Sequence, residues 1–84
     1  MNATKEQIQE AIALNKKLRE KLPRFSAFGD PNWDNINAEI RLLEQALDGG
    51  LPSMDDFPDE AEECHYWLRY PDRSEYLDTL RESV

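Results

Sequence analysis

Apolar residues recur at steps of three and four along two long segments, and this spacing constrains the fold of the chain more than any other feature. Such steps place side chains on one face of an α-helix. The first segment has them at Ile8, Ala11, Ile12, Asn15, Leu18 and Leu22, and the second at Trp33, Ile36, Ile40, Leu43 and Leu47. Two helices with one apolar face each, joined by a short turn, are expected to pack as an antiparallel hairpin.

Residues that start and stop helices set the expected bounds of the first helix. Thr4, followed three residues later by Gln7, fits a capping box, in which each side chain binds a free backbone N–H of the first turn. Pro23 disfavours a helical conformation for the residue before it. The first helix is therefore expected over about 4–22.

The second helix has start and stop signals of its own. Asp30 and Pro31 fit an N-cap followed by a proline in the first turn, where the missing N–H of proline has no cost. Gly49, followed by a second glycine, supplies the left-handed conformation that ends many helices. The second helix is therefore expected over about 31–48.

Two shorter helices are expected in the second half of the chain. One is predicted over about 59–69 and is closed by Pro71. Asp72 and Glu75 repeat the capping-box spacing, which places the last helix over about 73–82. No segment alternates apolar and polar residues with a period of two, so no sheet is expected. The predicted fold is all-α, a small helical bundle.

The length and net charge of the chain limit what it can do. Residues 1–84 make one small domain with a thin core, and the formal net charge is −8. Direct binding of nucleic acid is disfavoured, because a negative surface repels phosphates. A single cysteine excludes an internal disulfide framework. The longest apolar run spans residues 11–14, so we expect no membrane span, no signal peptide and a cytoplasmic location.

The negative charge is concentrated in the second half of the chain. Residues 43–84 hold twelve acidic and three basic side chains, and no Lys or Arg lies between Arg41 and Arg69. That base-free interval contains Glu44, Asp48, Asp55, Asp56, Asp59, Glu60, Glu62 and Glu63. The macrodipole of the third helix accounts for acids in its first turns, but not for those outside it. The pattern favours a docking surface for a basic protein, with ordinary solvated charge as the alternative.

Three aromatic residues adjoin the acidic interval. Tyr66, Trp67 and Tyr70 cannot all point inward from so short a helix, and Trp and Tyr commonly anchor protein interfaces. The alternative is that they cover the open side of the hairpin as core. We therefore predict a partner-binding site made of Asp55, Asp56, Asp59, Glu60, Glu62, Glu63, Tyr66, Trp67 and Tyr70.

The remaining reactive residues do not form a catalytic or metal site. Cys64 and His65 are the one candidate pair, but adjacent helical residues point about 100° apart, and the surrounding acids raise the pKa of a thiol. The acidic residues lack the spacing of a calcium loop, and one Cys with one His is a poor zinc site. We therefore predict no enzymatic activity, no catalytic residue, no metal and no cofactor.

Residues 26–33, with the sequence Ser-Ala-Phe-Gly-Asp-Pro-Asn-Trp, resemble a motif in short proteins of bacterial plasmids, prophages and integrative elements. That group has no assigned activity, so the resemblance implies no catalytic or ligand-binding residue. It implies a bacterial or phage origin and an accessory role. By analogy, acidic helical proteins of such elements include inhibitors that occupy the DNA-binding grooves of host nucleases.

Together these features predict a non-enzymatic acidic binding module that docks on a basic protein surface. Its sharpest form is a nucleic-acid-mimicking inhibitor of a host nuclease or DNA-binding protein. The alternative is a structural protein that acts through self-assembly, as a homodimer paired through apolar surface left over from the helical hairpin.

Overall fold

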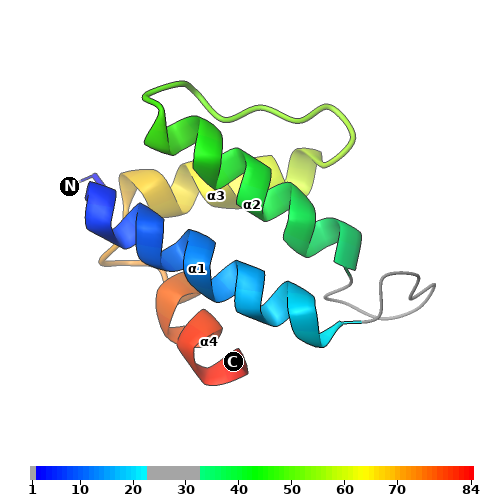
Figure 1. The fold of residues 1–84 in the computed structure, drawn as a ribbon. Coiled ribbons are helices and arrows are strands. Elements are labelled where there is room, and N and C mark those ends of the chain that lie inside the picture. The colour runs from blue at the N-terminus through cyan, green and yellow to red at the C-terminus, as the bar shows by residue number, and fades with distance from the viewer. Residues whose placement is uncertain (1, 23–32) are drawn as a thin grey trace.

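The computed structural model describes residues 2–22 and 33–84, which form four helices and no strand (Figure 1). The predicted all-α bundle is confirmed. Helix α1 (Lys5–Lys21) begins at the capping box expected from the sequence. The Thr4 hydroxyl accepts a hydrogen bond from the Gln7 backbone N–H at 3.1 Å, and the Gln7 side-chain oxygen accepts one from the Thr4 N–H at 2.8 Å.

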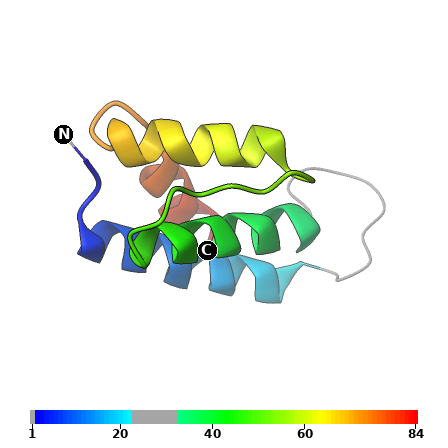
Figure 2. The ribbon, with the colours of Figure 1, turned by 90° about the horizontal axis from the view of Figure 1, so that it is seen from above.

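Helix α2 (Trp33–Leu47) runs antiparallel to α1, and the two lie side by side along their lengths (Figures 1 and 2). The expected N-cap at Asp30 and Pro31 lies outside the described residues. At the other end, Gly49 has a φ of +88°, as its expected role in ending the helix requires. Because α2 contacts both α1 and α3, it buries more than one stripe of side chains: Ile36, Ala38, Ile40, Leu42 and Leu43.

The segment between α2 and α3 runs back along the length of the bundle (Figure 2). The Gln45 side chain fixes its path by accepting a hydrogen bond from the Ser53 N–H at 2.9 Å and donating one to the Ser53 carbonyl at 3.3 Å. His65 Nε2 donates to the buried Pro52 carbonyl. As a result, α3 (Pro58–Arg69) starts beside the start of α2 and runs in the same direction.

Helix α4 (Tyr76–Ser83) packs against α1 and buries Leu77 and Leu80. The predicted start at a capping box of Asp72 and Glu75 is wrong. The residues after α3 form a turn in which the Arg73 N–H bonds to the Tyr70 carbonyl at 3.1 Å. Helix α4 begins after this turn, and its N-cap residue, Glu75, makes no side-chain capping hydrogen bond.

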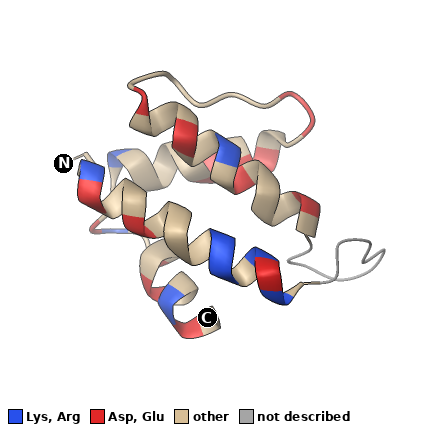
Figure 3. Ribbon diagram, viewed as in Figure 1, with Lys and Arg blue, Asp and Glu red and all other residues tan. Residues whose placement is uncertain are grey.

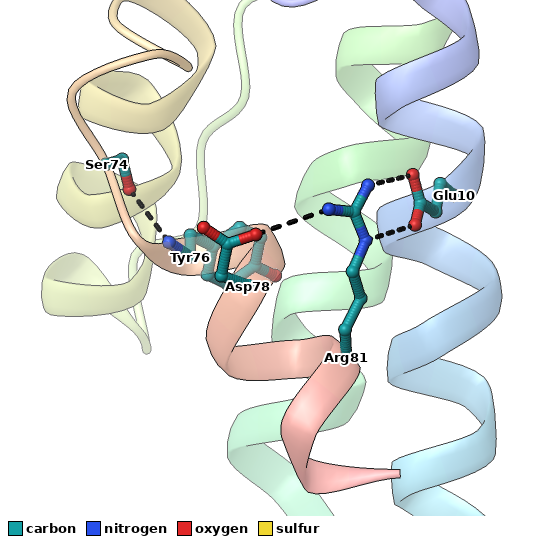
Figure 4. Close-up of polar contacts among 5 residues, drawn as sticks. All are labelled: Glu10, Ser74, Tyr76, Asp78 and Arg81. Carbon is teal, nitrogen blue, oxygen red and sulfur yellow. Dashed lines mark hydrogen bonds and ion pairs between the residues drawn. The ribbon is translucent and has the colours of Figure 1, made fainter.

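Polar contacts are made at the start of α4 and near its end (Figure 4). At its start, the Ser74 hydroxyl accepts a hydrogen bond from the Tyr76 N–H at 3.2 Å. Further along, Arg81 makes a two-point ion pair with Glu10 of α1, at 2.7 and 2.9 Å. These hydrogen bonds from Arg81 lower the pKa of Glu10. The last helix is therefore tied to the first by a charged contact as well as by apolar packing.

The interior is a continuous apolar cluster drawn from all four helices. Trp67 of α3 is the largest of its fully buried side chains, and its ring lies 5.3 Å from that of Tyr76, tilted by 59°. None of the helices in residues 2–22 and 33–84 has the length and apolar character needed to cross a bilayer.

Candidate functional site

The predicted acidic residues lie on the segment between α2 and α3 and on the first turns of α3 (Figure 3). Five of them are exposed, and Glu60 is partly buried. Within the described residues, the ion pairs are those of Arg81 with Glu10 and with Asp78. No lysine or arginine in that part of the chain therefore neutralises the predicted acidic set: Asp55, Asp56, Asp59, Glu60, Glu62 and Glu63.

The structure gathers half of this set in one open groove between α3 and α4, with a volume of about 670 Å³. Asp59, Glu62 and Glu63 line it from α3, and Glu75 adds a fourth carboxylate from the start of α4. The rest of the lining is Tyr66, Ser74, Tyr76 and Thr79. We call this the acidic groove. Its lining contains aromatic and hydroxyl side chains but no basic residue.

The other three predicted acids lie elsewhere. Asp55 lines a separate hollow of about 480 Å³ beside the start of α3, which also includes Glu62. Asp56 is exposed in the segment before α3. Glu60 turns toward α2, where its carboxylate accepts a hydrogen bond from the Asn35 side chain. The predicted patch is thus a groove of three acids with three outlying members.

The three predicted aromatic anchors have different environments. Tyr66 is 51% exposed and lines the acidic groove. Tyr70 is partly buried, with its ring 5.4 Å from that of Tyr66 and the Arg73 guanidinium 5.2 Å from its centroid. Trp67 is only 1% exposed, so its prediction as a surface anchor is wrong. The Trp67 side chain instead belongs to the hydrophobic core, which was the alternative interpretation of the aromatic residues.

A carboxylate that sequence reasoning missed lies beneath the groove. Glu39 of α2 is partly buried, and burial, followed by the nearby charges of Glu63 and Glu60, raises its pKa to about 7. The Tyr76 hydroxyl, which lowers this pKa slightly, shares a small cavity with Glu39 and accepts a hydrogen bond from Asn15 Nδ2 at 2.8 Å. The only sequence signal was a charged residue next to the apolar stripe of α2.

Cys64 and His65 do not form a nucleophile–base pair. Cys64 is buried, and burial, with a smaller effect of Glu39, raises its thiol pKa to about 12, so the reactive thiolate is scarce at neutral pH. His65 instead uses Nε2 to hold the Pro52 carbonyl. Across residues 2–22 and 33–84, no three His, Cys, Asp or Glu side chains are arranged to hold a metal ion.

No protein-family model matches the chain, and neither does any curated protein or any solved structure. Nearly all of the segment that resembles the plasmid and prophage proteins, residues 26–32, lies outside the described residues. The resemblance therefore stays a prediction, and the acidic groove is interpreted from its own chemistry.

Proposed function

We propose that this protein is a non-enzymatic binding module that docks its acidic groove onto a basic protein surface. The observation that carries the proposal is the groove itself. Four carboxylates line it, and no lysine or arginine among the described residues pairs with them. Charge of one sign, unneutralised within a concave surface, attracts cationic groups and accelerates their association.

The groove also offers more than charge. Tyr66 exposes about half of its surface at the edge of the groove, and a tyrosine ring can contact the guanidinium of an arginine through a cation–π interaction. The hydroxyls of Ser74 and Thr79 add neutral hydrogen-bonding groups. An arginine-bearing segment of the partner fits this combination best.

The sharpest form of the proposal is mimicry of nucleic acid. A DNA-binding protein recognises the backbone through cationic side chains that contact successive phosphates. Carboxylates on adjacent turns of α3 would occupy such a surface in place of phosphates. The resemblance to proteins of bacterial mobile elements favours a host nuclease or DNA-binding protein in the cytoplasm as the partner.

Capture of a partner from bacterial lysate tests the proposal. The full chain, the groove variant (Asp59→Asn, Glu62→Gln, Glu63→Gln) and a control variant (Glu20→Gln, Glu44→Gln, Asp48→Asn) serve as baits. Both variants lose three negative charges, but the control changes exposed acids away from the groove. We expect the wild type and the control to capture the same partner, and the groove variant to lose it.

The salt dependence is a second measurement on the same baits. Capture should be strong at about 50 mM salt and lost near 1 M, where the Debye length falls to about 3 Å. Tyr66→Ala should weaken it as well. Equal loss with both charge variants, or capture unaffected by salt, would contradict docking through the groove.

Self-assembly remains the second candidate, because one exposed apolar residue favours it. Leu51 is 81% exposed beside a hollow of about 520 Å³ at the end of the bundle, which Ile8, Ala46 and Leu68 help to line. Light scattering over a concentration series separates the two candidates. A dimer that Leu51→Ser dissociates supports self-assembly, whereas a monomer at all concentrations rules it out.

A further inference from the structure

Tyr76 joins α4 to the other three helices. Its hydroxyl accepts a hydrogen bond from Asn15 of α1, and it lines a small cavity together with Glu39 of α2. Its ring packs against Trp67 of α3 at 5.3 Å. We call Asn15, Glu39, Trp67 and Tyr76 the Tyr76 junction. Each of its four members comes from a different helix, so the junction lies where all four helices meet.

The surroundings of Glu39 oppose a negative charge. From α3, Glu60, Glu63 and Cys64 line a cavity of about 10 Å³ together with Glu39 and Tyr76. A volume of this size holds at most about one water molecule. From α4 the facing group is Tyr76, and from α1 the junction receives Asn15, which does not titrate. Within the described helices, no lysine or arginine forms an ion pair with Glu39.

We infer that the Tyr76 junction is a proton-sensitive latch: with Glu39 protonated it holds α3 and α4 firmly on the α1–α2 hairpin, and ionisation of Glu39 loosens that packing. An ionised Glu39 adds a third charge beside Glu60 and Glu63 in a space that has little room for water. A neutral carboxyl removes this repulsion. It also keeps the capacity to accept a hydrogen bond from a neighbouring hydroxyl.

The direction of the pH dependence follows from the pKa of Glu39. Burial and the two neighbouring carboxylates raise that pKa from 4.5 to about 7 in the folded protein. A group whose pKa is higher in the folded state stabilises the fold fully below its unfolded pKa, and this stabilisation is lost as the pH rises through the folded pKa. The latch is therefore closed in mildly acidic solution and opens above neutral pH.

Urea unfolding of the isolated full chain at about pH 5.5 and about pH 8.5 tests the latch. Other carboxylates also titrate, so the informative quantity is the difference between the wild type and Glu39→Gln. Between the two pH values we expect the folding equilibrium constant of the wild type to fall at least about tenfold relative to that of Glu39→Gln. His65→Gln is the control for the one histidine of the chain, and the pH dependence of its stability should follow that of the wild type.

The indole N–H resonance of Trp67 gives a local reading of the same event, since its ring lies against Tyr76. In a Trp33→Phe background it is the only indole signal. We expect its chemical shift to titrate near pH 7 in the wild type and to lose this step in Glu39→Gln. Parallel pH profiles for the two proteins, or a Trp67 signal with no step near neutral pH, would overturn the latch.

Two further variants keep the test decisive if Glu39→Gln folds poorly. Glu63→Gln removes a repelling charge and should move the Trp67 step to lower pH. Tyr76→Phe removes the hydroxyl that lowers the pKa of Glu39 and should move the Trp67 step to higher pH. Shifts in the same direction, or no shift in either, would contradict the assignment to Glu39. All of these measurements use the protein without a partner, so they are independent of whether the acidic groove captures one.

Discussion

Asn15 shows how a single polar residue on an apolar helix face can determine which helices meet. It is fully buried among the apolar residues of α1. Its Nδ2 donates to the Ala11 carbonyl at 2.9 Å and to the Tyr76 hydroxyl at 2.8 Å. Among the described residues, its side-chain oxygen has no hydrogen-bond partner. A buried, unpaired acceptor is costly, so Asn15 contributes specificity at some expense in stability.

Substitutions at this position separate the two effects. Asn15→Ala should lower the free energy of unfolding by about 1–3 kcal/mol, because it opens a cavity and removes the donor to Tyr76. Asn15→Leu keeps the number and branching of the side-chain heavy atoms and removes the unpaired oxygen, so we expect it to be less destabilising than Asn15→Ala. Urea unfolding measures both. A larger loss with leucine than with alanine would mean that the larger apolar side chain strains the packing around this position.

Helix ends that depend on neighbouring residues in the sequence could be predicted, whereas features that depend on packing between helices could not. The capping box of Thr4 and Gln7 and the left-handed Gly49 depend on neighbours in sequence, and both are confirmed. The start of α4 was misplaced because a turn closed by Arg73 took precedence over the capping pattern. The packing of α2 against two helices likewise buried Leu42, which the single apolar stripe had omitted.

Gly49 provides a test of a helix end. Its φ of +88° disfavours residues with a Cβ, yet a Cβ built there meets no atom within 4 Å. The cost of Gly49→Ala is therefore conformational, and we expect a loss of about 1 kcal/mol in the free energy of unfolding. Gly49→Asn is the matched control and should cost less, because asparagine tolerates this conformation. Equal losses in thermal or urea unfolding would contradict the backbone explanation.

For the molecule as a whole, the sequence predicted the acidic surface but not its shape. The net charge and the base-free interval could be counted directly. The acidic groove could not be predicted in this way, because one wall of the groove is α3 and the carboxylate of Glu75 comes from the start of α4. The same limit applied to Trp67, whose burial depends on α4 supplying Tyr76 to cover it. A surface assembled from two helices is visible only once their packing is known.

Charge repulsion on this surface should oppose folding. Glu62 and Glu63 lie beyond the first turn of α3, where the helix dipole stabilises carboxylates less, and neither has a cationic partner in the described structure. We expect the double variant Glu62→Gln, Glu63→Gln to raise the melting temperature by a few degrees at about 50 mM salt. The gain over the wild type should shrink at about 500 mM salt. A lower melting temperature at both salt concentrations would mean that these acids stabilise the fold.

Because α2 and α3 run parallel, the fold brings two helix amino termini close to several carboxylates. Their amino-terminal ends lie next to each other, joined by the hydrogen bond between Asn35 and Glu60. Each end carries roughly half a unit of positive charge from aligned peptide groups, so two such ends together form a backbone counter-charge for Asp34, Asp59 and Glu60. Among the described residues, no lysine or arginine forms an ion pair with any of these three acids, so the helix ends supply part of their balancing charge. Under the proposed function, the outward-facing carboxylates of the acidic groove would then bind cations of another molecule.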